Sequence, residues 1–471
     1  MAYPDTYYQR TMAEQTVRMP LSGTAECDTV IIGGGLAGLT TALQLCRAGQ
    51  KVVVLEAESV GFGASGRNGG FVSPGYATDG EQIAGIAGKD IARQLHLLSM
   101  EGVDFVRDTI RDLAIDSADP RPGILSVLRY DDGASLKAYR DQVARDYRYE
   151  LQYLERDEVR AMLKSERYFE GLRSSYAFHM HPLNYLRGVA AEIERLGGKI
   201  HEATAATGTD FAGAEKRVRT PTGEVKARNV VFTTGGYTGS LEPRLKRAFL
   251  PIATYVMVSE EAPDLIATAI ATTDAVGDNR RAGDYYRLVD DGRRILWGGR
   301  ITTRAASMAG LVQELRKEMT TTYPQLAGLK TELAWSGLMS YARHLMPQIG
   351  QVEPGVWHCT AFGGHGRRRQ GGGGSHSRPV GPLQAVRAVW PGLGRRPGRS
   401  GRRPTDLLET AGSRLVARTG RVTRQHDGSK SMIGRLILTY PDASRRLGSL
   451  LVLTVIALGL YQMGISAKWL G

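Results

Sequence analysis

The sequence predicts an α/β fold in two domains, one on a parallel sheet of Rossmann type and one on a mixed or antiparallel sheet. Near the N-terminus, an apolar strand, a glycine cluster, a helical pattern and a second apolar strand follow within about thirty residues, the length of a βαβ unit. A later apolar strand again ends in glycines, and residues 251–322 show strand patterns around one helix. A chain of 471 residues with 42% hydrophobic residues is long enough for two or three domains.

The βαβ unit begins at Asp28 with DTVIIGGGLAGLTTALQLCRAGQKVVVLEAE, and its glycines fit the pattern GxGxxG. Gly33 permits a tight turn, Gly35 lets a pyrophosphate approach the backbone, and Gly38 lets the helix lie against the sheet. The helix begins with N–H groups and a partial positive charge that favour phosphates. Glu56, at the end of the second strand, is placed to accept hydrogen bonds from ribose hydroxyls. The unit predicts a dinucleotide site and leaves the choice between NAD and FAD open.

Two further glycine-rich stretches are candidates for the same site. The loop GFGASGRNGGFVSPGY, residues 61–76, combines many backbone N–H groups with Arg67, which suits an anionic or carbonyl-rich ligand; the alternative is a plain surface loop. The strand in KARNVVFTTGGYTGSL carries Thr234, Gly235 and Gly236 to its carboxyl end, where open α/β sheets bind ligands.

The cysteines, the histidines and the N-terminus argue against several classes of protein. Cys27, Cys46 and Cys359 form no CxxC or metal spacing and indicate a reducing compartment. His179 and His181 lie close together without a third ligand nearby, so we expect no metal site. The N-terminal stretch MAYPDTYYQRTMAEQTVRMPLSG is polar and has no secretory h-region, so we expect a cytoplasmic protein.

The net charge of +13 comes from the end of the chain. Residues 367–471 contain 19 Lys and Arg against 4 Asp and Glu, which leaves 42 basic and 44 acidic residues in the first 366. Because the main body is slightly acidic, we expect it to bind no nucleic acid.

Taken together, these motifs resemble the FAD-dependent oxidoreductases of the D-amino-acid oxidase family. The resemblance rests on VIIGGGLAGLTTALQL with VVVLEAE, on GASGRNGG, VVFTTGGY, DYYR and GGR, and on the closing FGGHG, and it covers residues 1–366. Within the family, GASGRNGG and a terminal GGHG are most similar to the bacterial γ-glutamylputrescine oxidoreductase group. The resemblance resolves the open choice in favour of FAD. It implies an FAD-binding domain assembled from separate segments, with a substrate domain on a large mixed sheet over the flavin.

The resemblance also implies roles for single residues. The ADP half of FAD would be bound by Gly33, Gly35, Gly38 and Glu56, and the pyrophosphate and flavin would be lined by Ser65, Arg67, Asn68, Gly69 and Gly70. The adenosine side would be closed by Thr234, Gly235 and Gly236. The pyrimidine edge of the flavin would lie beside Gly363, Gly364, His365 and Gly366. At that edge, backbone N–H groups and a helix N-terminus would stabilise the anionic reduced flavin.

The implied chemistry is oxidation of a C–N bond in an amine or amino-acid-like substrate. Hydride equivalents leave the α-carbon for flavin N5, the imine hydrolyses to a carbonyl, and dioxygen or another acceptor reoxidises the flavin. This chemistry requires no side-chain base, so no catalytic residue is assigned. Tyr285, Tyr286 and Arg287 are the substrate-contact candidates, because an aromatic wall and a carboxylate-binding arginine suit such a substrate. Cross-strand packing in the second sheet is the alternative interpretation of these three residues.

The family fold implies a division of the chain into segments. We expect an N-terminal arm at 1–25, an FAD-binding domain from 26–90, 160–245 and 335–366, a substrate domain from 91–159 and 246–334, a basic tail at 367–430 and a hydrophobic segment at 431–471. In the family, GGHG is followed by an apolar helix that packs under the flavin, and the basic tail stands in its place here.

Three interpretations of residues 367–430 compete: a basic tail that forms no packed core, a nucleic-acid-binding arm, and translation in a wrong frame. Arg, Gly, Pro and Ser are the residues that GC-rich DNA encodes out of register. When Gly381–Gly392 and Pro404–Ala411 are written in permitted codons and read one base later, they give DRYKLFAPFGL and QLTYWKL, which look like the family's C-terminal region. We therefore favour a frameshift after Gly366 that damages this side of the flavin site.

Residues 447–467, LGSLLVLTVIALGLYQMGISA, are uncharged and long enough to span a bilayer. They suggest either a C-terminal membrane anchor or translation past a lost stop into a neighbouring frame, and we favour the second. A membrane-anchored or nucleic-acid-associated binding protein that uses the basic tail is the alternative function.

Overall fold

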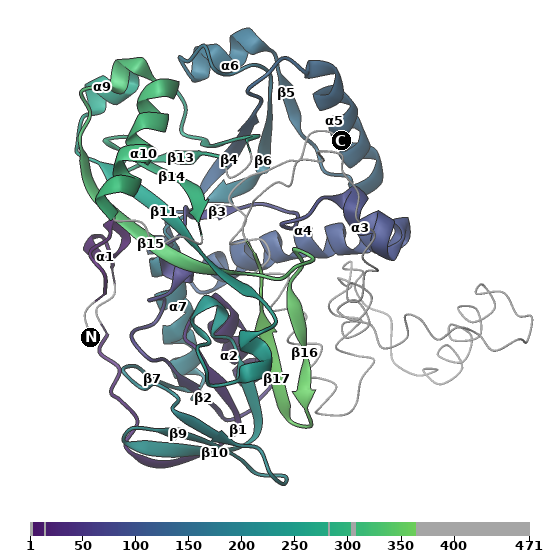
Figure 1. Ribbon diagram of the computed structural model, residues 1–471, viewed down its shortest axis with the longest axis vertical. Helices are drawn as coiled ribbons and strands as arrows, with labels where there is room; N and C mark the ends of the chain where they lie inside the picture. Colours follow the sequence, from purple (N-terminus) through teal and green to yellow (C-terminus); the bar gives the residue numbers. More distant parts are fainter. Residues whose placement is uncertain (1–2, 14–15, 281–282, 303–307, 364–471) are drawn as a thin grey trace, which may run out of the picture.

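The computed structural model describes residues 3–13, 16–280, 283–302 and 308–363. These residues form two β-sheets, of which sheet A occupies the lower half of Figure 1 and sheet B the upper half. The predicted α/β class, with one parallel and one mixed sheet, is confirmed. The basic tail and the hydrophobic segment predicted at 367–430 and 431–471 lie outside the described residues.

Sheet A has a parallel centre with antiparallel edges. Its parallel strands follow the order β17, β10, β1, β2, β7, while β16 pairs antiparallel with β17 and the β8–β9 hairpin pairs antiparallel with β10. The bounds are β1 (Gly23–Ile32), β2 (Val52–Leu55), β7 (Lys199–His201), β8 (Gly208–Asp210), β9 (Lys216–Thr220), β10 (Gly223–Phe232), β16 (Gln348–Glu353) and β17 (Val356–Thr360). Because sheet A is covered on both faces, β2, with the sequence VVVL, is buried throughout.

Three helices pack on one face of sheet A: α2 (Leu36–Arg47), α4 (Lys89–Asp112) and α7 (Pro182–Arg195). Their apolar side chains share one core with strand residues such as Val54 and Val231. α7 begins with proline at its first position, and the His181 side chain caps it by accepting the Asn184 N–H at 3.1 Å. A separate cluster that includes Val30 and Phe232 covers the other face.

Sheet B follows the order β15, β11, β14, β13, β12, β4, β6, β3, with β5 paired to β6. β12 and β4 are parallel and the other pairs are antiparallel, so the sheet is mixed. The bounds are β3 (Phe71–Val72), β4 (Arg121–Val127), β5 (Gln152–Leu154), β6 (Gly171–His179), β11 (Leu250–Ser259), β12 (Ala275–Asp278), β13 (Tyr285–Val289), β14 (Arg294–Thr302) and β15 (Thr331–Tyr341).

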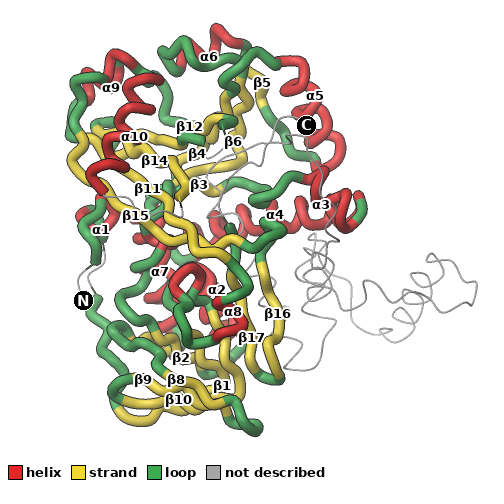
Figure 2. Tube along the Cα trace, viewed as in Figure 1, coloured by secondary structure: helices red, strands yellow, loops and turns green. Residues whose placement is uncertain are grey.

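Figure 2 shows further helices around sheet B. The remaining helices are α1 (Tyr7–Arg10), α3 (Gly80–Ala87), α5 (Gly133–Tyr147), α6 (Arg156–Met162), α8 (Pro243–Lys246), α9 (Pro263–Ala267) and α10 (Met308–Thr322), with short 3₁₀ turns η1 (Ala64–Gly66), η2 (Asp116–Ala118), η3 (Gly235–Tyr237) and η4 (Pro324–Leu326). α10 packs its apolar face against sheet B, in a core centred on Trp297 and Tyr286, whose rings stack at 4.3 Å.

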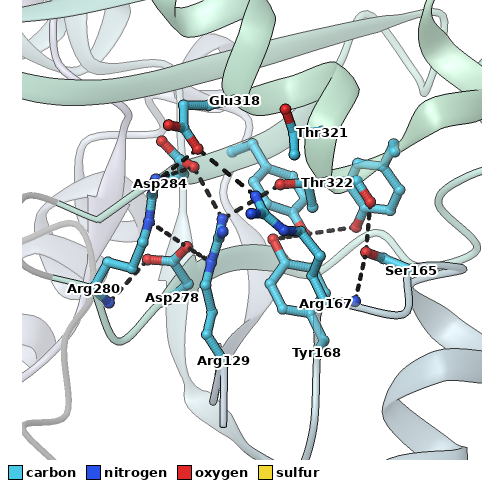
Figure 3. Close-up of polar contacts among 12 residues, drawn as sticks. Arg129, Ser165, Arg167, Tyr168, Asp278, Arg280, Asp284, Glu318, Thr321 and Thr322 are labelled. Carbon is cyan, nitrogen blue, oxygen red and sulfur yellow. Dashed lines mark hydrogen bonds and ion pairs between the residues drawn. The ribbon is translucent and has the colours of Figure 1, made fainter.

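A group of charged side chains lies between sheet B and α10 (Figure 3). We call it the charge cluster; its members are Arg129, Asp278, Arg280, Asp284 and Glu318. The side chains of Asp278 and Asp284 are almost wholly buried, and each contacts both Arg129 and Arg280.

The structure divides the chain differently from the expected segments. β6 lies within the expected FAD-binding segment 160–245, and β15 overlaps the start of the expected segment 335–366. Both strands belong to sheet B, because they pair along their length with its strands. α4, expected in the substrate domain, contributes to the core on sheet A instead. Within the described residues, none of the helices is long and apolar enough to cross a bilayer, and residues 447–467 lie outside them.

Candidate functional site

A cavity of about 370 Å³ opens at the carboxyl ends of β1, β2 and β10. Its walls come from the turn after β1, the end of β2, the loop that precedes η1, the η3 turn after β10, and the end of β15. Open α/β sheets bind their ligands at this edge. The volume lies in the range of about 300–1,000 Å³ that is usual for small-molecule and cofactor sites.

The turn after β1 is built by close backbone packing. Gly33 has φ +112°, and a Cβ there would lie 3.0 Å from the carbonyl oxygen of Thr233 on the neighbouring strand. A Cβ at Gly38 would lie 1.9 Å from the carbonyl oxygen of Gly33. Only glycine lets α2 start this close to the strand, which leaves the space beyond the turn open for a ligand.

The N-terminus of α2 faces this space. α2 has no side-chain cap and no acid in its first turn. Ser65 Oγ accepts the Leu36 N–H at 3.1 Å, and a Cβ on Gly35 would come within 3.1 Å of the same hydroxyl. The partial positive charge of the helix N-terminus and the small residues beside it suit a pyrophosphate.

Glu56 lies at the end of β2 and lines the cavity. Its carboxylate accepts the Gly34 N–H at 2.6 Å and the Glu58 N–H at 3.0 Å. Burial raises the pKa of Glu56, and the two N–H donors oppose that rise. Glu56 thus ties the glycine turn to β2 and leaves a carboxylate on the cavity wall, where a ribose hydroxyl can donate to it.

The glycine-rich loop that follows is shaped by its own side chains. Asn68 donates to the carbonyl oxygens of Ala64 at 3.1 Å and Ser65 at 2.9 Å, and its own oxygen accepts the Gly70 N–H at 2.8 Å. Arg67 lies 4.8 Å from the centre of the Phe62 ring and donates to the Tyr237 hydroxyl at 3.1 Å. The loop therefore meets η3 on the far side of the cavity.

The η3 turn closes the cavity against β15. Gly235 has φ +51°, and a Cβ on Gly236 would lie 3.0 Å from the carbonyl oxygen of Leu338. The Tyr237 hydroxyl accepts the Leu338 N–H at 3.2 Å. Sheet B therefore contributes directly to the wall of a cavity whose floor belongs to sheet A.

The predicted cofactor residues fall into three groups. Those that line the cavity are Gly33, Gly35, Glu56, Ser65, Thr234, Gly235 and Gly236. Those that shape its surroundings are Gly38, Arg67, Asn68, Gly69, Gly70 and Gly363. Those that lie outside the described residues are Gly364, His365 and Gly366.

The predicted substrate residues lie on different faces of β13. Tyr286 is fully buried in the core with α10, and its hydroxyl bonds to those of Tyr323 at 2.6 Å and Tyr168 at 3.2 Å. Arg287 is also buried and donates to the carbonyl oxygen of Gly69 at 2.8 Å. Tyr286 thus packs in the core, as in the alternative interpretation, whereas Arg287 is bonded to the glycine-rich loop. Tyr285 is half-buried and also lies beside this loop: a Cβ on Gly69 would come within 2.6 Å of its ring.

Several residues that line the cavity were not predicted from the sequence. Phe62, Tyr237, Leu338, Met339 and Phe362 all line the cavity. Tyr237 directly follows the glycine pair after β10, and this position was a usable signal. Leu338 and Met339 carry no such signal, because only the pairing of β15 with β11 brings them to the site.

The residues present fit FAD. The glycine turn excludes any Cβ, Glu56 offers a carboxylate to a ribose, and the uncapped α2 offers N–H groups to phosphates. Comparison with known proteins agrees: residues 28–367 match the family model "FAD dependent oxidoreductase" (DAO).

Relatives and solved structures extend this likeness over most of the chain. γ-Glutamylputrescine oxidoreductase of Escherichia coli K12 is 33% identical over 367 residues, covering 77% of this chain and 85% of the relative. A probable oxidoreductase OrdL of Haemophilus influenzae is 29% identical, covering 77% and 84%. Glycine oxidase from Geobacillus kaustophilus superposes with a TM-score of 0.60 at 17% identity, covering 72% of this chain and 89% of that structure. The chain belongs to the DAO family of FAD-dependent oxidoreductases, and its cofactor is FAD.

Proposed function

We propose that this enzyme oxidises the C–N bond of an amine or amino-acid-like substrate of the γ-glutamylputrescine type and that dioxygen takes the electrons. The observation that carries the proposal is the cavity lined by the glycine turn and Glu56, in a chain that is 33% identical to γ-glutamylputrescine oxidoreductase of E. coli. When bound, FAD supplies the acceptor for the hydride that leaves the substrate's α-carbon. The imine product then hydrolyses to a carbonyl compound and ammonia, and dioxygen is reduced to hydrogen peroxide by the two electrons taken from the substrate.

In this proposal, the residues of the chain bind and orient FAD and the substrate. Glu56 accepts from the ribose, and the N-terminus of α2 with Ser65 holds the pyrophosphate. The loop before β3 carries the flavin side of the site. Tyr285 provides an aromatic wall next to Gly69 and helps to exclude water from the reacting carbon. The unpaired thiols of the three cysteines support a cytoplasmic location.

The test is anaerobic reduction of the bound flavin by candidate amines. The protein is loaded with FAD, and its absorbance is followed after addition of γ-glutamylputrescine, putrescine or glycine. γ-Glutamylputrescine is expected to bleach the flavin fastest, and in air the same mixture is expected to release peroxide. An FAD-loaded protein whose flavin no amine reduces would exclude the proposed reaction while leaving the family assignment intact.

We also propose that residues 367–471 come from a shifted reading frame. The family match ends at residue 367, at the point where the composition turns to arginine and glycine. The segment lacks the apolar pattern of a helix that packs under a flavin, so we expect weak FAD retention.

Restoring the frame tests this second proposal. The nucleotide sequence around codon 367 is read in the shifted frame, and a gene corrected there is expressed beside the original. The corrected protein is expected to keep FAD through gel filtration while the original loses it. If the shifted frame encodes no apolar helix, or if both proteins retain FAD equally, residues 367–471 are genuine.

A further inference from the structure

The N-terminal arm, residues 3–13 and 16–22, runs along one side of the molecule from sheet B to sheet A (Figure 1). Tyr8 on α1 is 0% exposed and lies in a cluster with Leu183 of α7 and with Val256 and Trp335 of sheet B. Its ring meets His181 edge to face at 4.9 Å between centroids. An apolar side chain of this size, buried against sheet B and α7, fixes the arm in one place.

One arm tyrosine, Tyr8, is linked through Arg287 to the far end of the glycine-rich loop. The guanidinium of Arg287 donates from Nε to the Gly69 carbonyl at 2.8 Å and from Nη2 to the Met180 carbonyl at 2.9 Å. The same Nη2 donates to the Tyr8 hydroxyl at 3.3 Å. The Tyr8 hydroxyl is thus one of the acceptors that hold the Arg287 guanidinium beside Gly69.

Arg287 depends on these neutral acceptors. It is 6% exposed, and among the described residues no carboxylate lies within ion-pairing distance of it. Burial, with a contribution from the charge of Arg287, lowers the pKa of both His179 and His181 to about 3, so these neighbours stay neutral. A buried cation without a counter-ion must have its N–H groups satisfied by oxygen acceptors, which makes each acceptor costly to lose.

A second arm tyrosine is bonded to the near end of the loop. The Tyr3 hydroxyl donates to the Val60 carbonyl at 2.6 Å and accepts from Arg187 at 2.7 Å. Arg187 also donates to the carbonyl oxygen of Thr16 on the arm at 2.9 Å. The Val60 N–H is held by Glu202 at 2.8 Å.

We propose that Tyr3 and Tyr8 are positioning residues that clamp the two ends of segment 60–70 and so hold Phe62–Ser65 in place on the wall of the FAD cavity. The inference rests on the FAD site but not on the identity of the amine. Segment 60–70 contains one 3₁₀ turn and no longer helix, so bonds from other parts of the chain contribute to its position. At the near end Tyr3 bonds to the segment directly, and at the far end Tyr8 acts through Arg287.

The test uses Tyr8→Phe and Tyr3→Phe in the full chain, because both keep the ring and remove one hydroxyl. Hydrogen exchange of the amides in 61–70 is measured by mass spectrometry on FAD-free protein, and FAD affinity is measured by quenching of FAD fluorescence. Each variant is expected to exchange about fivefold faster and to bind FAD about fivefold more weakly, the equivalent of one net hydrogen bond. Because the ends are separate, the double variant is expected to show about the product of the two effects.

Tyr7→Phe is the matched control. Tyr7 is on the same helix and half-buried, and its ring packs on Tyr8 at 5.6 Å, but its hydroxyl bonds to the backbone of Asp290 and not to the loop. It is expected to leave both readouts unchanged. The proposal is overturned if Tyr3→Phe and Tyr8→Phe match Tyr7→Phe in loop exchange. Because exchange is measured without FAD or substrate, a failure of the proposed reaction does not affect this result.

Discussion

The glycine turn after β1 and the charge cluster behind sheet B are both buried, but they are held together in opposite ways. In the turn, Gly33 and Gly38 bring backbone against backbone, and the single carboxylate, Glu56, is bound by main-chain N–H groups. In the charge cluster, Arg129 binds Asp278 and Asp284, which come from the ends of other strands. The turn is a local structure, whereas the cluster exists only after distant segments meet.

This difference predicts different failure modes. A defect in the turn is steric and cannot relax, because the atoms in contact belong to the backbone. A defect in the charge cluster is electrostatic and can be shared, since each arginine has a second carboxylate nearby. The turn should therefore respond to added volume and the cluster to altered charge and pH.

The largest effect is expected for Gly38→Ala. The new Cβ would lie 1.9 Å from the carbonyl oxygen of Gly33, so α2 must move away from the sheet. We expect a loss of about 3 kcal/mol in unfolding free energy, measured by urea titration, together with loss of bound FAD. Gly85→Ala is the control, because Gly85 is in α3 with nothing within 4 Å of an added Cβ, and it should be neutral or slightly stabilising. A Gly38→Ala protein with normal stability and FAD affinity would contradict the steric account.

The next effect is expected for Asp278→Asn in the charge cluster. The change removes one of two carboxylates from the buried Arg129 while keeping the side-chain shape. We expect a loss of about 2 kcal/mol by urea titration, less than for a fully broken buried pair, because Asp284 remains as a partner. Asp131→Asn breaks an exposed pair with Arg156 and should cost under about 1 kcal/mol. Equal effects of the two substitutions would show that burial adds nothing to the cluster.

The same contrast explains how far the sequence argument reached. The turn was predictable residue by residue, since Gly33, Gly35, Gly38 and Glu56 lie within one βαβ unit. The spacing of the glycines and of the acid after the second strand indicates the role of each residue. The existence of a second sheet was predictable from strand patterns, and the resemblance implied that it is mixed, but the strands that belong to it were not predictable. β6 and β15 join it through pairings that no local pattern reveals.

The DYYR motif shows the limit most clearly. A strand exposes alternate residues on opposite faces, so Tyr285 and Tyr286 had to point in opposite directions, and periodicity alone does not say which face meets the loop. The charge cluster could not be predicted from local sequence patterns either, because Asp278 and Asp284 bind Arg129 across sequence separations of 149 and 155 residues.

A pH effect separates the two regions further. Burial and then the charge of Asp278 raise the pKa of Asp284 from 3.8 to about 7, so the folded protein holds this proton more tightly than the unfolded chain. The associated stability is fully present below about pH 4 and is lost as the pH rises through about 7. Relative to Asp284→Asn, the wild type is expected to lose unfolding free energy from pH 5 to 8, with a slope of at most about 1.4 kcal/mol per pH unit. If the unfolding free energies of the two proteins changed with pH in parallel, the proton would be bound by a group other than Asp284.

The smallest effect is expected for Tyr286→Phe, and it decides between packing and substrate contact for the DYYR motif. The substitution removes a hydroxyl that bonds to Tyr323 and Tyr168 and keeps the ring stacked on Trp297. Because one hydrogen bond contributes about 1 kcal/mol net, we expect a loss of about 1 kcal/mol in unfolding free energy. KM for the oxidised amine should stay within about twofold, since Tyr286 is fully buried in the core with α10, on the face of β13 opposite Tyr285. Tyr285→Ala is the companion variant and should raise KM instead. Tyr286→Phe could instead raise KM and leave the unfolding free energy unchanged. In that case the face of sheet B that packs against α10 would contact the substrate, and the distinction between the ligand site and a purely structural core would be wrong for this residue.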